Sequence, residues 1–334
     1  MSHLLPQPLQ AGPLTLKNRL IMPPMATAKA DPEGKVSPAL LDYYQEKSQG
    51  GYLSLIIIEH SFVHADGKAS NRQLSVSDDN LIDGLKKLAQ VIQSNGSKTV
   101  MQINHAGSHT APEITHSVPV APSAVPHPRR NNLPEELARK EIAAIIKSFQ
   151  EAARRTKEAG FDGVEIHAAH GYLLNQFFSP LTNKRTDEYG GNVHNRIRIH
   201  LQIIEEIRSA VGDDFPILLR LGAMDFKDGG ITIEDSQIAA QAFEKAGVNL
   251  LDISGGFSGY MIPGLTGQGY FVSLTEAIKN VVSIPVILTG GITDVYSAER
   301  LLLEEKADLI GVGRAILNDS KWAERALSRF PSLA

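Results

Sequence analysis

Two histidines and a tyrosine lie close together in the sequence, directly after a short apolar segment. His167 ends that segment, and His170 and Tyr172 follow it in the motif HAAHGY. Two imidazole N–H groups can polarise a carbonyl or nitro oxygen, and a phenol can give a proton to the neighbouring carbon. A His-x-x-His pair can instead bind zinc or iron, but no third ligand is signalled nearby. We therefore expect Tyr172, His167 and His170 to be catalytic, and we expect no metal site.

Arg220 stands in an otherwise apolar segment, Leu218–Leu221. A guanidinium group that faces a protein interior needs an anionic partner, because an unpaired buried charge is very costly. One interpretation is a structural ion pair with a carboxylate such as Glu165. The other is that Arg220 and Gln102 face an electron-accepting ring, which becomes anionic when it is reduced. The sequence is compatible with both interpretations.

Glycines follow the last two apolar segments of the chain. Gly290 and Gly291 end one segment, and Gly313 and Arg314 end the next. Glycine lets a backbone approach a phosphate closely, and Arg314 would add a charged donor. The glycines could also serve only tight turns. Two such sites on neighbouring segments favour a phosphate, although this signal alone does not identify a flavin.

Short β-branched segments alternate with longer helical patterns along the whole chain. The predicted strands are Leu20–Met25, Leu53–Glu59, Thr99–Asn104, Gly163–His167, Ile217–Leu221, Leu250–Ser254, Val286–Thr289 and Leu309–Val312. The predicted helices include Asp79–Asn95, Glu135–Ala159, Asn195–Val211, Glu234–Ala246 and Val295–Glu305. Eight strands alternating with helices predict an α/β fold, the (β/α)₈ TIM barrel, which places functional residues at the carboxyl ends of its strands. A doubly wound sheet is the alternative, but no Gly-rich turn follows the first strand. No linker divides residues 1–334, so we expect a single domain.

The composition excludes several classes of partner and site. A net charge of −4 without a run of basic residues gives no general attraction to nucleic acid. The chain has no cysteine, so it offers no disulfide, no thiolate nucleophile and no cysteine ligand for zinc or an iron–sulfur cluster. The apolar stretch Leu53–Ile58 is too short to span a bilayer, and the first residues lack a signal-peptide pattern. These features predict a cytoplasmic protein with a small-molecule substrate and no membrane or nucleic-acid partner; a homo-oligomer is compatible with them.

Several motifs together resemble the old yellow enzyme family of FMN-dependent ene reductases, over about Pro8 to Phe330. The most specific motif runs from Gly163 to Arg196 and reads GVEIHAAHGYLLNQFFSPLTNKRTDEYGGNVHNR. Shorter motifs are NRLIMPPM, QINHAG, TGGI and ADLIGVGR. The resemblance implies a barrel that binds FMN and takes a hydride from NAD(P)H. It also implies hydride transfer from flavin N5 to the activated C=C bond of a small α,β-unsaturated carbonyl or nitro compound.

The resemblance implies a role for each matching residue. His167 and His170 would bind the oxygen of the activating group, and Tyr172 would donate the proton. Arg220 would lie beside the flavin edge that carries negative charge after reduction. The other implied cofactor-binding residues would line the flavin ring or hold its phosphate: Pro23, Pro24, Met25, Ala26, His60, Gln102, Gly290, Gly291, Gly313 and Arg314.

Three positions depart from the family pattern. Ala26 stands where family members usually carry Thr or Cys, Ala28 where the small bacterial ene reductases carry Tyr, and His60 where a small residue is usual. These departures bear on redox potential and on substrate range. The segment MPPMAT resembles the barrel part of 2,4-dienoyl-CoA and enoate reductases, which also carry a cysteine-bound iron–sulfur cluster and a second half. Because this chain has no cysteine, we expect a stand-alone barrel without the cluster.

Two other functions are compatible with the sequence. A phosphate-binding barrel could be a lyase or isomerase that binds no flavin, and Lys184 lies near the histidines along the chain, although nothing else signals a Schiff base. The second alternative is a flavin-binding protein without catalytic activity. A purified protein without visible absorbance would favour the lyase or isomerase. A yellow protein that turns over no enone would favour the flavin-binding protein without catalytic activity.

Overall fold

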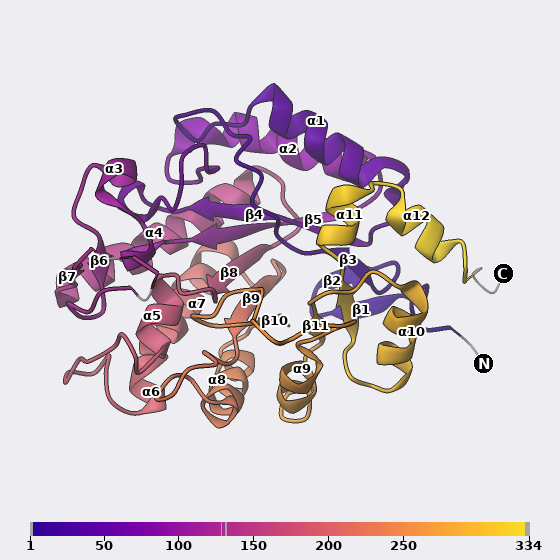
Figure 1. Ribbon diagram of the computed structural model, residues 1–334. Coiled ribbons are helices and arrows are strands. Elements are labelled where there is room, and N and C mark those ends of the chain that lie inside the picture. The colour runs from indigo at the N-terminus through magenta and orange to yellow at the C-terminus, as the bar shows by residue number, and fades with distance from the viewer. Residues whose placement is uncertain (1–2, 128, 131, 331–334) are drawn as a thin grey trace.

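The computed structural model describes residues 3–127, 129–130 and 132–330. Parallel strands form a closed barrel in which the neighbours follow the order β10-β11-β12-β3-β4-β5-β8-β9 (Figure 1). The barrel strands are β3 (Leu20–Met22), β4 (Leu55–Phe62), β5 (Lys98–Asn104), β8 (Val164–Ala168), β9 (Ile217–Gly222), β10 (Leu250–Ser254), β11 (Val286–Leu288) and β12 (Leu309–Gly311). Each of them overlaps one predicted strand, so the predicted TIM barrel is confirmed.

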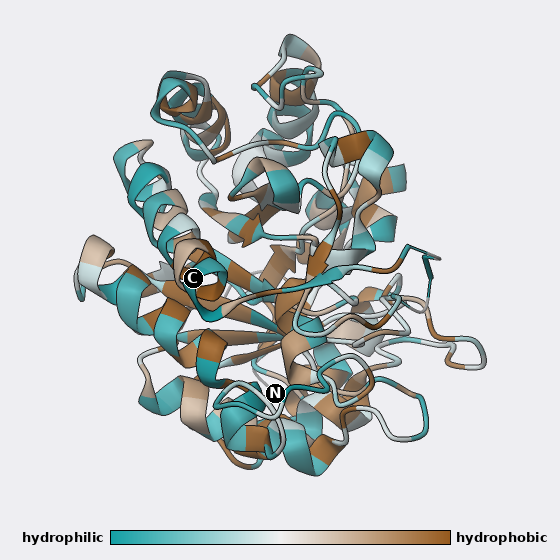
Figure 2. Ribbon diagram, turned by 90° about the vertical axis from the view of Figure 1, so that its left-hand side faces the viewer, coloured by the Kyte–Doolittle hydropathy of each residue, from teal (hydrophilic) through white to brown (hydrophobic). Residues whose placement is uncertain are grey.

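Helices surround the barrel and connect its strands (Figure 1). They are α1 (Pro38–Ser48), α2 (Ile82–Ser94), α3 (Pro112–Thr115), α4 (Arg139–Glu158), α5 (Leu173–Phe178), α6 (Val193–Arg196), α7 (Arg198–Val211), α8 (Ile233–Lys245), α9 (Val272–Lys279), α10 (Val295–Leu303), α11 (Arg314–Asn318) and α12 (Trp322–Leu327). In α4, Ile142, Ile145 and Phe149 recur at helical spacing and are buried. Figure 2 shows the result, with largely hydrophobic strands inside and helices that mix polar and apolar residues around them.

The first barrel strand ends earlier than the sequence predicts. It was expected to reach Met25, but β3 ends at Met22. The reason is Pro23 and Pro24, which carry no backbone N–H for the strand ladder. The chain therefore leaves the barrel wall before Met25 and can place the following residues at the rim.

The second barrel strand continues further than the sequence predicts. β4 runs to Phe62, and its register against β5 shifts between Ile58 and Ser61. Such an irregularity changes the direction in which side chains point, and it is common next to active sites. The segment Glu59–His60 lies within this irregularity.

The structure also contains elements that the sequence analysis did not predict. Glu135–Glu136 form β7 and pair with β6 (Val120–Ala121), so the helix expected from Glu135 begins only at α4. Near the N-terminus, β1 (Leu9–Ala11) and β2 (Leu14–Leu16) form an antiparallel hairpin. Strands of two or three residues give too little alternation for a sequence pattern to reveal.

The hairpin closes the amino-terminal end of the barrel. Its residues Leu14 and Leu16 belong to one buried cluster with side chains from the barrel strands, among them Ile21, Val100 and Leu250. Because this cluster fills the lower barrel with apolar side chains, polar chemistry is confined to the opposite, carboxyl-terminal end. Among the described residues, no helix is long and apolar enough to cross a membrane.

Candidate active site

One cavity of about 710 Å³ lies at the carboxyl ends of the barrel strands. It brings together every catalytic and cofactor-binding residue predicted from the sequence. These lining residues are Pro23, Pro24, Met25, Ala26, His60, Gln102, His167, His170, Tyr172, Arg220, Gly290, Gly291, Gly313 and Arg314. They meet because all strands of a parallel barrel end at the same rim. Their individual roles stay predictions.

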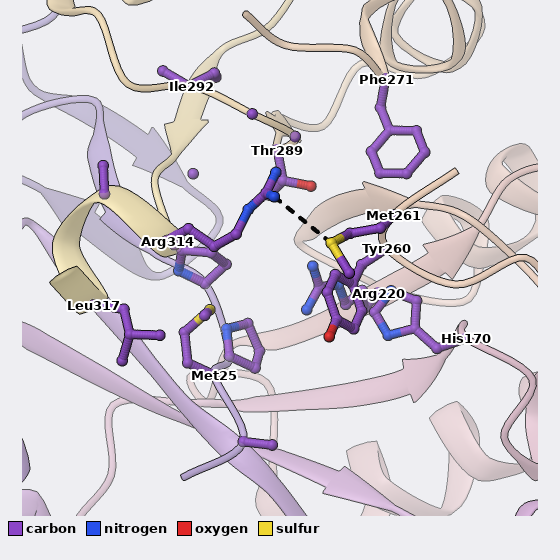
Figure 3. Close-up of a pocket in the computed structure, with 18 of the residues that line it drawn as sticks. Met25, His170, Arg220, Tyr260, Met261, Phe271, Thr289, Ile292, Arg314 and Leu317 are labelled. Carbon is purple, nitrogen blue, oxygen red and sulfur yellow. Dashed lines mark hydrogen bonds between the residues drawn. The ribbon is translucent and has the colours of Figure 1, made fainter. Parts of the chain in front are cut away.

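The loop between β10 and α9 forms a wall of the cavity that the sequence analysis missed. It contributes Tyr260, Met261, Tyr270 and Phe271. Figure 3 shows Met261 facing Arg314, with Tyr260 beside it. The available signal was the length of chain that follows the predicted strand Leu250–Ser254, since long loops at barrel rims tend to carry function. The other lining residues are Thr289, Ile292, Thr293, Gly311, Ala315, Leu317 and Asn318.

His167 offers one N–H donor to a ligand in this cavity. Its Nδ1 accepts the backbone N–H of Ala169 at 3.3 Å, which leaves Nε2 to carry the proton of the neutral ring. Burial, followed by the neighbouring His170, lowers the pKa of His167 well below its ordinary value. The imidazole is therefore neutral at pH 7, with its proton on Nε2.

His170 is held in place by its backbone and by its ring. Its φ of +60° is uncommon outside glycine and often marks a functional constraint. Its backbone N–H donates to the carbonyl of Gly255 at 3.2 Å, and Nε2 of its ring lies 2.7 Å from the hydroxyl of Ser254. The ring stands edge-on to His167 with the centroids 5.0 Å apart. The fold thus keeps two imidazoles together at one end of the cavity.

The alternative of a metal site gains no support from the structure. In residues 3–127, 129–130 and 132–330, no group of three or more His, Asp or Glu side chains is arranged to hold a metal ion. His167 and His170 consequently have no third protein ligand within those ranges. Each ring also has one nitrogen in a hydrogen bond with the protein, which suits donation to an oxygen.

Tyr172 packs among aromatic side chains beside the histidine pair. Its ring is 4.9 Å from that of His167 and stacks on His109 at a centroid distance of 4.9 Å. Burial raises the pKa of Tyr172 to about 12, so the phenol keeps its proton at pH 7. A positioned phenol that holds its proton can act as a general acid. The packing residue His109 was not predicted from the sequence.

Arg220 forms an ion pair and also lines the cavity. Its Nε lies 3.1 Å from Oδ2 of Asp252, whereas Glu165 accepts a hydrogen bond of 2.7 Å from Gln102. Glu165, the partner suggested by the sequence, is therefore not the partner. The reason is the strand register, which places Arg220 of β9 directly beside Asp252 of β10. The two interpretations of Arg220 are compatible, since the paired guanidinium still reaches the cavity.

Two buried carboxyl groups, those of Glu165 and Asp252, lie near Arg220. Burial, followed by the charge of Asp252, raises the pKa of Glu165 well above its ordinary value. Burial raises the pKa of Asp252 to about 6, and Arg220 opposes that shift. Asp252 is thus ionised at pH 7 and balances the positive charge of Arg220, while burial favours the protonated form of Glu165. Protonation of Asp252 below about pH 6 would leave that charge unbalanced.

Gly290 and Gly291 are required by the turn itself. Their φ values are +112° and +70°. A Cβ atom on Gly291 would lie 2.3 Å from the carbonyl oxygen of Gly267, and one on Gly290 would lie 2.9 Å from the ring of Tyr270. The tight-turn interpretation therefore explains these two glycines without a ligand.

Arg314 carries a stronger signal for an anion than the glycines do, because packing against Met25 already explains Gly313. Gly313 has a φ of −96°, which any residue can adopt, but a Cβ atom there would lie 2.8 Å from the sulfur of Met25. The nearest polar partners of the Arg314 guanidinium are the hydroxyl of Tyr270 at 3.4 Å and the sulfur of Met261 at 3.6 Å. Within the described part of the chain Arg314 forms no ion pair, so its charge is available to an anionic ligand.

Ala26 is not compensated by its neighbour Thr27. The hydroxyl of Thr27 donates to Oε2 of Glu59 at 2.6 Å, and Thr27 does not line the cavity. Burial raises the pKa of Glu59 to about 7. The position occupied by Thr or Cys in the family thus contributes no side-chain hydrogen bond to the cavity.

The residues of the cavity fit FMN. Gln102 and Arg220 can serve a polar ring edge that becomes anionic, and Arg314 can serve a phosphate. Apolar groups such as Pro23 and Met25 can pack on a flat ring. The cavity volume also lies in the range of small-molecule and cofactor pockets.

Known proteins are similar to this chain over nearly all of its length. The family model described as "NADH:flavin oxidoreductase / NADH oxidase family" matches residues 5–332. A NADH oxidase of Thermoanaerobacter brockii is 44% identical over 94% of this chain and 49% of its own length. A NADPH dehydrogenase of Clostridium acetobutylicum is 37% identical over 92% of this chain and 89% of its own length.

A solved structure, the old yellow enzyme homologue from Zymomonas mobilis, superposes with a TM-score of 0.84 at 25% identity, over 98% of this chain and 93% of that one. The chain spans about half the length of the first relatives that it matches, and nearly the whole length of the NADPH dehydrogenase. The match to the family model, the fold and the assembled cavity agree. The chain belongs to the NADH:flavin oxidoreductase / NADH oxidase family, the family of the old yellow enzymes.

Proposed function

We propose that this chain is an ene reductase that uses NAD(P)H to reduce the activated C=C bond of a small unsaturated carbonyl or nitro compound. The observation that supports this most directly is the position of Tyr172, His167 and His170 in the same cavity as Arg220 and Arg314. When bound, FMN supplies hydride transfer from NAD(P)H to the β-carbon of the substrate. The chain must then bind the activating group and deliver a proton.

The histidine pair binds and orients the substrate. His167 donates its Nε2–H to the oxygen of the activating group, and the ring of His170 lies close enough to serve the same oxygen. Such donors act most strongly where negative charge develops, here on the oxygen that becomes enolate-like. Tyr172 then gives its phenol proton to the α-carbon. NAD(P)H and the substrate use the same cavity in turn, which makes the reaction ping-pong.

The lyase or isomerase without a flavin has less support. The one lysine considered for a Schiff base, Lys184, does not line the cavity. Its exposed Nζ donates to the carbonyl of Pro180 at 2.5 Å. A flavin-binding protein without catalytic activity would share the cavity and is separated from an ene reductase only by turnover.

The purified protein is expected to carry about one FMN per chain, released on denaturation, because the flavin supplies the redox chemistry. Absorbance and chromatography of the released cofactor measure this. Anaerobic NADPH should bleach the flavin, and 2-cyclohexenone should restore its colour. FAD, or a colourless protein that does not take up FMN, would contradict the cofactor assignment. Bleaching without recovery by any enone or nitroalkene would favour the non-catalytic alternative.

The reduction potential of the FMN-loaded protein is expected to respond in opposite directions to Arg220→Ala and Asp252→Asn. Loss of Arg220 should lower the two-electron potential by about 30–65 mV, because a hydrogen bond to a charged group contributes about 1.5–3 kcal/mol. Asp252→Asn should raise the potential, since it leaves Arg220 unbalanced. Gln102→Ala should lower it. Anaerobic titration against reference dyes measures all three, and unchanged potentials in Arg220→Ala and Gln102→Ala would remove both residues from the flavin edge.

A further inference from the structure

His60 enters the cavity from an irregular part of the barrel wall. It lies in β4 where the register against β5 shifts between Ile58 and Ser61, and its side chain lines the cavity. A regular strand would direct alternate side chains to opposite faces. Because the register shifts here, the side chain of His60 faces the cavity at a position that another residue would occupy in a regular strand.

Gln73 fixes the tautomer of His60. The amide oxygen of Gln73 accepts the N–H of Ala69 at 2.6 Å, which settles the orientation of the amide group. Its Nε2 then donates to Nδ1 of His60 at 2.6 Å and to the His60 carbonyl at 3.1 Å. Since Nδ1 is an acceptor, the proton of the neutral ring must be on Nε2.

The ring of His60 is neutral at pH 7. Burial, followed by the charge of Arg220, lowers its pKa to about 4. No residue of the described part of the chain forms a hydrogen bond with Nε2 of His60, whose ring is only partly buried because it borders the cavity. The Nε2–H group is therefore a donor without a protein acceptor.

This donor is close to the catalytic groups. The ring of His60 is 5.3 Å from that of Tyr172 and 6.3 Å from that of His167, measured between centroids. His60 and His167 each hold their proton on Nε2. Together with His170, the cavity is lined by three imidazoles, whereas a carbonyl oxygen has two lone pairs.

We propose that His60 is a specificity-determining residue whose Nε2–H binds a second oxygen of the activating group. The site then favours substrates with two acceptor oxygens, as in a nitro group, over substrates with one carbonyl oxygen. The inference rests on the proposed ene reductase function. The preference arises because a bound substrate covers this donor, and a donor that is covered without an acceptor is costly. A nitroalkene satisfies a donor that an aldehyde leaves unpaired.

The test compares two substrates with the same carbon skeleton, β-nitrostyrene and cinnamaldehyde, on the FMN-loaded protein. The measured quantity is the ratio of their kcat/KM values. His60→Phe keeps a ring of similar size but removes the donor, and His60→Gln keeps an N–H donor. The ratio should fall about tenfold in His60→Phe, the effect of one lost hydrogen bond, and should return to within about threefold of its original value in His60→Gln.

A binding measurement makes the test independent of turnover. Nitrobenzene and benzaldehyde carry the same two activating groups without a reducible C=C bond, and their dissociation constants follow from changes in flavin absorbance. The ratio of the nitrobenzene to the benzaldehyde dissociation constant should rise about tenfold in His60→Phe, which corresponds to the fall in the kinetic ratio. If the protein reduces neither styrene substrate, the ene reductase proposal fails, while the binding ratio still decides the role of His60.

Two results would overturn the inference. The first is that His60→Phe and the original protein have the same kcat/KM ratio and the same ratio of dissociation constants. The second is a changed flavin reduction potential in His60→Phe together with an unchanged ratio of the two dissociation constants. That result would mean that the Nε2–H of His60 binds the flavin and not the substrate. If His60→Phe does not take up FMN, His60→Ala replaces it in the same comparison with the same expected ratios.

Discussion

Tyr172→Phe is expected to slow enone reduction by about a hundredfold or more, because a positioned general acid contributes about 10² to 10⁴ in rate. The substitution removes the phenol that keeps its proton at pH 7, while the ring stays between His109 and His167. Ligand affinity and flavin reduction by NADPH should change little. Stopped-flow measurement of the two half-reactions separates these effects.

The control for this prediction is Tyr52→Phe. The hydroxyl of Tyr52 donates to Glu324 at 3.2 Å, and the residue does not line the cavity. Both half-reactions of the control should stay within about twofold of the original rates, since nothing at the cavity changes. If Tyr172→Phe slows only flavin reduction and leaves enone reduction intact, Tyr172 is not the proton donor.

Replacing His167 or His170 by Ala is expected to weaken the binding of phenolate ligands and to slow enone reduction by about ten- to a thousandfold. Each substitution removes one donor to the oxygen that becomes enolate-like. Absorbance titration with a phenol measures binding, and stopped flow measures the oxidative half-reaction. The exposed residue His194 provides the control, and His194→Ala should leave both measurements unchanged.

His170 needs a second variant, because its φ of +60° is costly for alanine. Asn adopts this conformation more readily, so His170→Asn separates the loss of the ring from strain in the backbone. Comparable losses in His170→Asn and His170→Ala would assign the effect to the ring. If neither histidine substitution changes ligand binding, the pair does not bind the substrate oxygen, and the metal interpretation of His-x-x-His has to be tested by metal analysis.

The sequence predicted which residues share the cavity better than it predicted the contacts between them. Residues at strand ends, such as His167 and Arg220, could be placed together because a parallel barrel brings every strand end to one rim. The ion partner of Arg220 could not be assigned, because it depends on the register between β9 and β10. The wall formed by Tyr260 and Met261 was missed for a related reason, since the path of a long loop follows from packing rather than from a local pattern.

The sequence by itself determined those features that depend only on residues close together along the chain. Hydrophobic periodicity marked the barrel strands and most of the long helices, and Pro23 with Pro24 contained the reason why β3 ends at Met22. The absence of cysteine excluded every cysteine-ligated group in this chain. Only the tertiary structure decided which side chains form ion pairs and hydrogen bonds with one another. Asp252 beside Arg220 and Gln73 beside His60 are contacts between residues distant in sequence, and their geometry is set by strand register and an irregular strand that no local pattern encodes.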